Sequence, residues 1–198
     1  MKNFLFYAGF TLLLTACGGS EQAESTSATN SPEQPVAEEQ SEDQIFLQLS
    51  PYLVDEPQGQ GDTDQNAIIN YAINELIPLE RTPRGVFYRV LEAGEGELLE
   101  WGDYIRVHYK GYFLDGKVFD DTRVREKPLE FYIGNMIEGW NYGLQNVAPG
   151  GTIQLFVTSP LAYGEEGLPN AKGGLLVPPN TPLVFEVEIL ELLKEAGE

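Results

Sequence analysis

The stretch that decides the fold is Ile137-Glu138-Gly139-Trp140-Asn141-Tyr142-Gly143-Leu144-Gln145-Asn146-Val147. Its residues Trp140, Leu144 and Val147 stand at positions i, i+4 and i+7, the spacing that puts apolar side chains on one face of a helix. A short helix of this kind needs a sheet to cover its apolar face. We therefore expect Trp140 near the centre of a contact between helix and sheet.

Apolar and polar residues alternate at period two on both sides of this helix, which is the pattern of strands with one buried face. The expected strands cover residues 86–92, 104–114, 117–120, 129–133, 152–158 and 183–193. Asp115-Gly116 is a strong hairpin signal between two of them, whereas residues 159–181 are rich in Gly and Pro and are expected to be mostly loop. One helix against one antiparallel sheet predicts a two-layer α+β domain.

The 198 residues carry a net charge of -19, which is spread unevenly along the chain. Residues 18–80 contain no Lys or Arg and are rich in Glu, Gln, Ser, Asp and Pro, so the first third is poor in material for a core. The charge argues against nucleic acid as a partner, because binding to phosphates rewards Lys and Arg. It also argues against docking of the protein surface onto anionic lipid.

The first residues have the pattern of a removable signal peptide, which we expect over residues 1–16. Lys2 is positively charged, residues 4–14 are apolar but too few for a bilayer that needs ~20 helical residues, and Leu14-Thr15-Ala16 precedes the cysteine Cys17. The ending resembles the bacterial lipobox, which implies lipid on Cys17, with palmitate among its acyl chains. An ordinary secretory signal with an incidental cysteine is the alternative.

The sequence predicts an acidic, disordered linker over residues 17–63 and an accessory helix over residues 64–81. Within this segment the helix itself is expected to run from an N-cap at Asp64 to about Ile77, where Pro78 ends it. Its apolar side chains form one stripe, which consists of Ile68, Ile69, Ala72, Ile73, Leu76 and Ile77. The stripe either packs on the domain, which we favour, or forms a dimer. The apolar patch at residues 45–53 either folds back on the domain or binds a partner.

The sequence offers no nucleophile with a base and no set of zinc ligands. His108 is the chain's single histidine, and strand alternation points it away from the face of Val107 and Tyr109. Cys17 falls in the expected lipidation motif and leaves no free cysteine for catalysis. The sequence therefore argues against a hydrolase or a metalloenzyme, and it predicts neither a metal nor a cofactor.

What remains is a group of aromatic side chains with few polar partners, which could be no more than the core of the domain. The aromatic residues are Tyr109, Phe119, Phe131, Trp140, Tyr163 and Phe185, and Asp120 is their polar partner. Their local sequences are Val107-His108-Tyr109-Lys110-Gly111, Asp115-Gly116-Lys117-Val118-Phe119-Asp120, Ile137-Glu138-Gly139-Trp140, Ala162-Tyr163-Gly164, and Val177-Pro178-Pro179-Asn180 followed by Leu183-Val184-Phe185-Glu186-Val187. In this order and spacing they resemble the FK506-binding-protein (FKBP) family of peptidyl-prolyl cis-trans isomerases. The resemblance runs from about Thr82 to Leu193 and predicts such a domain over residues 82–195.

The resemblance implies an antiparallel half-barrel wrapped around one short helix, with a substrate's proline ring placed over the indole of Trp140. By position, the pocket walls are Tyr109, Phe119, Phe131 and Phe185, and the rim is Met136 and Ile137. The backbone N–H of Ile137 and the hydroxyl of Tyr163 would bind substrate carbonyls. Asp120 would supply the polar edge, held by Arg125 or by the hydroxyl of Tyr109.

The chain departs from the best-known members of the family at three places. Leu129 stands where an aromatic residue is common, and the substrate-contacting Leu168 stands where a histidine is often seen. The loop 169–177 is longer than in the smallest relatives; its glycines predict mobility, and its apolar end predicts binding of unfolded chains. A benign surface insertion is the alternative for this loop.

These patterns lead to an expected function. We expect an FKBP-type isomerase of the bacterial envelope, anchored through Cys17 in the outer membrane and facing the periplasm. Its expected partners are unfolded or nascent exported polypeptides that contain proline, and FK506-like macrolides are candidate ligands. The alternatives are a chaperone or scaffold that uses the same pocket with little turnover, and a structural lipoprotein that holds a partner.

Overall fold

The computed structural model describes residues 40–193. The chain divides into two units, Met1–Glu38 and Glu39–Glu198, and the described residues belong to the second. The expected signal peptide, Cys17 and most of the expected linker lie outside the described residues. Within residues 40–193, every helix is too short or too polar to cross a membrane.

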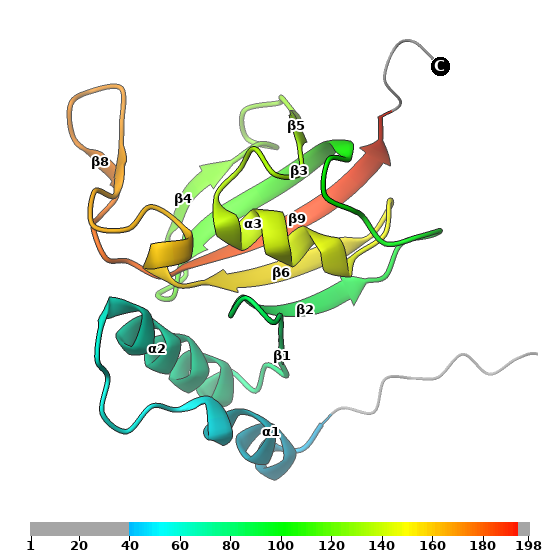
Figure 1. The fold of residues 1–198 in the computed structure, drawn as a ribbon. Helices are drawn as coiled ribbons and strands as arrows, with labels where there is room; N and C mark the ends of the chain where they lie inside the picture. The colour runs from blue at the N-terminus through cyan, green and yellow to red at the C-terminus, as the bar shows by residue number, and fades with distance from the viewer. Residues whose placement is uncertain (1–39, 194–198) are drawn as a thin grey trace, which may run out of the picture. The chain divides into compact units, whose positions relative to one another are not determined.

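The core of the second unit is an antiparallel sheet of seven strands (Figure 1). The strands are β1 Glu80–Arg81, β2 Phe87–Glu92, β3 Tyr104–Phe113, β4 Val118–Asp121, β5 Leu129–Tyr132, β6 Thr152–Val157 and β9 Leu183–Leu192. Their order is β1-β2-β6-β9-β3-β4, and β5 pairs with the first half of β3. The last strand of the chain therefore lies in the middle of the sheet. The alternating segments and the hairpin at Asp115-Gly116 are confirmed.

Helix α3, Glu138–Gly143, continues into a 3-10 turn η2, Leu144–Asn146, and crosses one face of the sheet (Figure 1). Trp140, Leu144 and Val147 are buried there, as their spacing predicts. Gly139 and Gly143 let the helix approach β6 closely. A Cβ atom on Gly143 would lie 2.6 Å from Leu155 Cδ2, and one on Gly139 would collide with Val157. The expected α+β fold, a sheet wrapped around one short helix, is confirmed.

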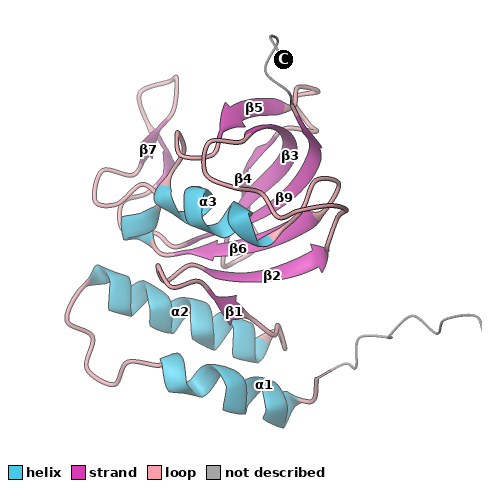
Figure 2. Ribbon diagram, turned by 45° about the vertical axis from the view of Figure 1, so that its right-hand side comes forward, coloured by secondary structure: helices cyan, strands magenta, loops and turns pink. Residues whose placement is uncertain are grey.

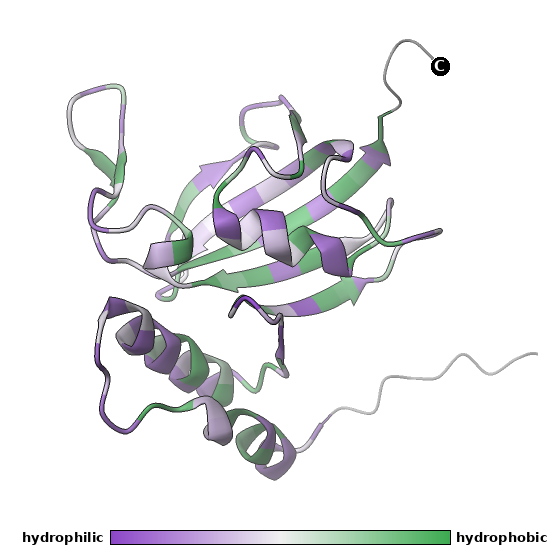
Figure 3. Ribbon diagram, in the orientation of Figure 1, coloured by the Kyte–Doolittle hydropathy of each residue, from purple (hydrophilic) through white to green (hydrophobic). Residues whose placement is uncertain are grey.

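The other face of the sheet carries a second helical layer, which the two-layer expectation missed. It contains α1 Glu42–Leu49, a 3-10 turn η1 Ser50–Tyr52 and α2 Gln60–Asn74 (Figure 2). Its buried side chains pack with strand residues in one cluster, which comprises Ile45, Leu49, Ile68, Ile69, Ala72, Ile77, Leu79, Phe87, Phe156 and Val184. Figure 3 shows hydrophobic residues along most of β6, and residues 153–157 of this strand are all buried. Strand β6 is thus buried on both faces, so the sheet requires a cover on both sides.

The linker expected to extend to residue 63 is therefore wrong over residues 42–63. Helix α1 begins with a capping box, in which the backbone N–H of Gln44 donates to Ser41 Oγ and that of Ser41 donates to Gln44 Oε1. Ile45 and Leu49 then stand four residues apart and are buried, so the patch at 45–53 folds back on the domain.

The accessory helix expected over residues 64–81 is helix α2, but its limits differ. Its N-cap is Gly59, so Asp64 lies one turn inside the helix instead of capping it. The helix ends at Asn74, and Leu76 takes a left-handed conformation with φ 54°. Leu76 is consequently exposed, whereas the rest of the expected apolar stripe is buried or half-buried against the sheet.

The segment expected to be mostly loop contains more order than its glycines suggest. It holds a 3-10 turn η3, Ser159–Leu161, and a small hairpin of β7 Leu168–Pro169 and β8 Leu175–Val177. The side chain of Asn170 closes the hairpin, because its Oδ1 accepts from the N–H groups of Lys172 and Gly174. An Asx turn of this kind is a local signal that composition alone conceals.

We predict that Gly139→Ala lowers the free energy of unfolding by about 1–3 kcal/mol, because the added methyl group would collide with Val157. Gly61→Ala is the matched control, since Gly61 is also the second residue of a helix but its Cβ would meet Pro160 Cγ at an ordinary 3.8 Å. It should leave stability unchanged or raise it by up to about 1 kcal/mol. Urea unfolding measures both, and equal effects would contradict the close packing.

Candidate active site

Four aromatic rings, each from a different strand, form a cluster with the indole of Trp140 on α3. Three of them surround the indole, and the fourth packs against one of these three. The ring centroid of Trp140 lies 5.0 Å from that of Tyr109 on β3, 5.4 Å from Phe185 on β9 and 5.5 Å from Phe131 on β5. Phe119 on β4 packs edge-on against Phe185 at 5.8 Å. The structure thus brings together all five aromatic residues that the sequence assigned to the floor and walls of a pocket.

The other side chains assigned to the site also pack against this cluster. Met136 and Ile137 lie in the turn before α3, Tyr163 follows η3, and Leu168 lies on β7. Each of these four is half-buried, as are Tyr109, Phe119 and the pocket-edge residue Leu129. The half-buried side chains form the solvent side of the cluster, which we call the rim.

We call the aromatic cluster together with its rim the cup. Trp140, at its floor, is only 2 % exposed and Phe185 is 2 % exposed, so the surrounding side chains cover the indole in this structure. The reason is that aromatic rings approach the indole from several strands, and the rim packs over them. The indole Nε1–H is also buried and finds no acceptor within residues 40–193. An unsatisfied buried donor is costly, and such groups mark positions that call for an explanation.

The polar edge of the cup is a triad of Tyr109, Asp120 and Arg125. The Tyr109 hydroxyl donates to Asp120 Oδ2, and Arg125 Nη2 lies 3.2 Å from that hydroxyl and 3.3 Å from Asp120 Oδ2. Both partners that the sequence suggested for Asp120 therefore hold it. Burial, together with the hydrogen bond to Asp120, raises the pKa of Tyr109 above its ordinary value of 10.0. The hydroxyl stays protonated at neutral pH and fixes the carboxylate at the edge of the cup.

Two hydrogen-bond donors at the rim have no acceptor in the part of the chain that the structure describes. One is the backbone N–H of Ile137, the N-cap residue of α3, and the other is the hydroxyl of Tyr163. Burial, followed by the charge of Asp120, raises the pKa of Tyr163, so its hydroxyl keeps its proton. Both groups can donate to a bound molecule.

Asn141 is a site residue that sequence reasoning missed. Its side chain is buried, and its Oδ1 accepts from the N–H groups of Gly134 and Met136 at 2.8 and 3.2 Å, while its Nδ2 donates to the Met136 carbonyl at 2.7 Å. These bonds fix the turn that carries Met136 and Ile137. The available signal was a polar residue directly after Trp140 on a helix expected to pack against a sheet.

Gly111 makes room for the wall residue Phe119. A Cβ atom at Gly111 would lie 2.5 Å from Phe119 Cζ, so a larger residue on β3 would push that ring away.

His108, one strand position before Tyr109, contacts Thr122 Oγ1 through Nδ1 at 3.0 Å. It is a hydrogen-bonded strand residue rather than a member of the cup.

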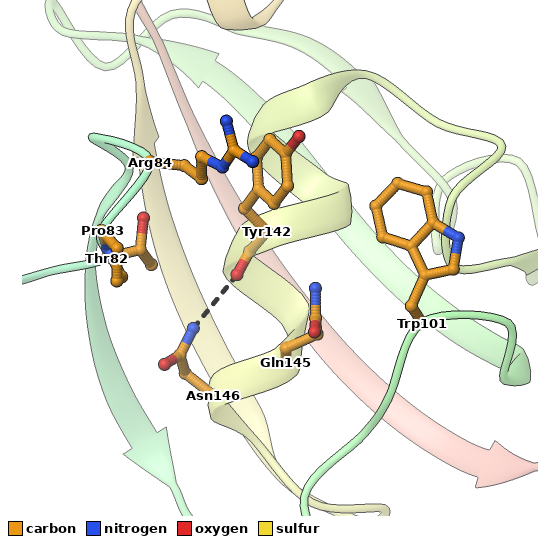
Figure 4. A pocket seen from close by; sticks show the side chains of 7 residues that line it. All are labelled: Thr82, Pro83, Arg84, Trp101, Tyr142, Gln145 and Asn146. Carbon is orange, nitrogen blue, oxygen red and sulfur yellow. Dashed lines mark hydrogen bonds between the residues drawn. The ribbon is translucent and has the colours of Figure 1, made fainter.

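A cleft of about 240 Å³ at the polar edge is lined by Arg125, Lys127, Pro128 and Leu129. Two larger clefts are lined by other residues of the described surface. One, of about 310 Å³, runs between β4 and the β7–β8 hairpin; its lining residues are Phe113, Lys117, Val118, Phe119, Leu175, Leu176 and Pro178. The other, of about 530 Å³, is lined by Thr82, Pro83, Arg84, Trp101, Tyr142, Gln145 and Asn146 (Figure 4). In it, the Arg84 guanidinium lies over the ring of Tyr142, across from Trp101. Of these two larger clefts, only the one beside β4 contains a residue that the sequence assigned to the site, which is Phe119.

Comparisons with known proteins point to one family. Residues 96–190 match the sequence profile of the family described as FKBP-type peptidyl-prolyl cis-trans isomerase. The chain is 44% identical over 108 residues to the FKBP-type peptidyl-prolyl cis-trans isomerase FkpA of Escherichia coli strain K12. The match covers 54% of this chain and 38% of the length of that relative.

Solved structures agree with this match. The crystal structure of AtFKBP13 shares 32% identity with a TM-score of 0.53, and the match covers 58% of this chain and 98% of that one. A peptidyl-prolyl cis-trans isomerase from Pseudomonas syringae shares 29% identity with a TM-score of 0.55, over 71% of this chain and 99% of that one.

The raised pKa of Tyr109 gives a prediction for stability at high pH. Above pH 10 the hydroxyl ionises in the unfolded chain but stays protonated in the folded protein, so the free energy of unfolding falls as pH rises through the folded pKa. We predict a smaller fall in Tyr109→Phe, measured by urea unfolding at about pH 8 and pH 10.5. Burial raises the pKa values of Tyr88 and Tyr112 to about 12. These two residues contribute equally to the fall in the wild-type protein and in Tyr109→Phe. An identical fall in both would refute the assignment.

Proposed function

The chain belongs to the FKBP family of peptidyl-prolyl cis-trans isomerases, and we propose that it catalyses the cis-trans isomerisation of X-Pro bonds in polypeptides. The aromatic cup carries this proposal: Trp140 forms its floor, with Tyr109, Phe131 and Phe185 around the indole. The Ile137 N–H and the Tyr163 hydroxyl, which have no acceptor among the described residues, border the cup together with the Asp120 carboxylate, which Tyr109 holds in place.

The chemistry requires no covalent step. Rotation about an X-Pro bond has a barrier of ~18–20 kcal/mol, because the amide must lose its resonance. In the twisted transition state the carbonyl is less dipolar than in the planar amide. An apolar aromatic cup therefore stabilises the transition state relative to the planar amide, which water solvates better.

The residues of the rim would hold the substrate during this rotation. The proline ring would enter between the half-buried side chains of Tyr109, Phe119 and Ile137 and reach the indole. The Ile137 N–H and the Tyr163 hydroxyl would then donate to carbonyls on either side of the proline. Such bonds keep the flanking chain in place while the imide bond turns.

We propose unfolded or nascent exported polypeptides as substrates. The cleft between β4 and the β7–β8 hairpin continues from Phe119 and ends at Leu175, which is 51 % exposed. This apolar path offers a place for the side chains next to the proline. Leu129 and Leu168 at the rim would favour apolar residues before the proline, since neither supplies a polar group.

The same path favours a second candidate function, which is binding of unfolded chains with little turnover. Val118 and Leu175 are both exposed and line this mostly apolar cleft from its two sides, and a contiguous apolar surface is typical of sites that bind other chains. FK506-like macrolides are proposed ligands of the cup under either function, because they require the aromatic surface and the rim donors but no turnover.

We also propose that the protein is a lipoprotein of the bacterial envelope. The support is the sequence before Cys17, where the apolar segment and Leu14-Thr15-Ala16 agree in register with the lipobox. Several acyl chains, each contributing ~0.8 kcal/mol per buried CH₂, would anchor the chain durably. Gly18 after the cysteine favours the outer membrane, with the domain facing the periplasm.

For catalysis, we predict that the chain from Gly18 onward accelerates the isomerisation of a short X-Pro peptide. Tyr163→Phe should lower kcat/KM by about 5- to 10-fold, since it removes one hydrogen bond worth about 1 kcal/mol. Tyr142→Phe is the matched control, because Tyr142 lines the other cleft, and it should retain full activity.

A protein that leaves the X-Pro peptide unaffected, yet suppresses aggregation of an unfolded protein, would refute catalysis and support the binding function. Loss of activity in Tyr142→Phe equal to that in Tyr163→Phe would refute the assigned role of Tyr163.

For the anchor, we predict that Cys17→Ser moves the protein from the membrane fraction to the soluble fraction of cells. Mass spectrometry of the wild-type protein should find acyl chains on the terminal cysteine. An unmodified wild-type protein, or a Cys17→Ser protein that still fractionates with membranes, would show the anchor proposal to be wrong.

A further inference from the structure

Asp64 is a buried acidic residue that none of the roles above explains. It lies on α2, in the helical layer on the far side of the sheet from α3, and is 1 % exposed. Burial of a carboxyl group is costly unless hydrogen bonds replace its lost hydration. The bonds that Asp64 makes therefore indicate what its position achieves.

Both oxygens of Asp64 accept hydrogen bonds. Oδ2 accepts from the backbone N–H of Ser159 at 2.7 Å, across 95 positions of sequence, and Oδ1 accepts from Gln60 Nε2 at 2.7 Å. Gln60 Nε2 also lies 3.3 Å from the Asn180 carbonyl. The first turns of α2 are thus bonded to two separate loops of the catalytic domain.

Tyr163 belongs to the first of these loops, and the second loop is hydrogen-bonded to the residue after it. The Ser159 carbonyl accepts from the N–H groups of Ala162 and Gly164 at 2.9 and 2.8 Å, so residues 159–164 form one hydrogen-bonded turn. The Gly164 carbonyl in turn accepts from the Asn180 N–H at 2.8 Å. Tyr163 lies within this hydrogen-bonded turn, and its hydroxyl is one of the two rim donors that have no acceptor within residues 40–193.

From this network we propose that Asp64 is a positioning residue for catalysis, which holds the turn 159–164 so that the Tyr163 hydroxyl faces the substrate. The inference rests on the proposed isomerase function. The side-chain hydroxyl of Ser159 has no hydrogen-bond partner within residues 40–193. The bond from the Ser159 backbone N–H to Asp64 is therefore the hydrogen bond that joins this residue to α2. Removal of the carboxylate would leave that N–H buried and unpaired, and the turn would shift to recover a partner.

The test is a double-mutant cycle on kcat/KM in the full chain. Asp64→Ala should lower kcat/KM by about 3- to 10-fold in the wild-type background, but by less than about 2-fold in Tyr163→Phe, because the hydroxyl it positions is already absent. Asp64→Asn keeps one acceptor oxygen for Ser159 and should recover part of the activity. Asp62→Ala is the matched control, because it removes a carboxylate from the same end of α2. Within residues 40–193 that carboxylate accepts a hydrogen bond only from the Gln58 N–H.

An equal loss from Asp64→Ala in both backgrounds, or no loss in a folded Asp64→Ala protein, would overturn the proposal. If the wild-type protein lacks isomerase activity, the proposed function fails. Amide hydrogen exchange then tests separately whether Asp64 holds the turn 159–164. Asp64→Ala, and more weakly Asp64→Asn, should then speed exchange at Ser159, Gly164 and Asn180 but not in β9. Unchanged exchange at these amides would refute it.

Discussion

The close approach of α3 to β6 is the constraint on which the rest of the structure depends. Two glycines, Gly139 and Gly143, lie one helical turn apart and bring the helix backbone against Val157 and Leu155. Only at this separation does the indole of Trp140 reach rings that stand on three different strands. A helix held farther from the sheet would leave a gap under the indole, and the cup would lose its floor.

The same contact organises the polar parts of the site. Asn141, next to Trp140, is buried with it and holds the turn that presents the Ile137 N–H. On the opposite side of the sheet, α2 reaches the turn that carries Tyr163 through Asp64. The two free donors of the rim are therefore placed by buried side chains from two different layers. The helical layer of α1 and α2 is part of the apparatus that shapes the site, in addition to covering the sheet.

Local patterns in the sequence predicted the strands and the hairpin at Asp115-Gly116, because alternation and turn chemistry act over a few residues. The aromatic cluster was predicted by the resemblance to the FKBP family. The local patterns failed where the cause is distant. Asp64 resembled a helix cap, but its partner lies 95 positions away, and no local pattern encodes that pairing. The layer of α1 was missed because an acidic composition concealed the capping box at Ser41. The coverage of the indole depends on several rings packing at once, which spacing alone does not determine.

The account claims that a proline ring reaches an indole that is 2 % exposed in the structure. The most direct measurement is the fluorescence of Trp140 in Trp101→Phe, which leaves a single tryptophan in the chain, during titration with a proline-containing peptide. The account predicts a saturable change in emission over the concentration range in which the peptide is isomerised. Emission that stays constant while isomerisation proceeds would place the reaction away from this cup and contradict the account.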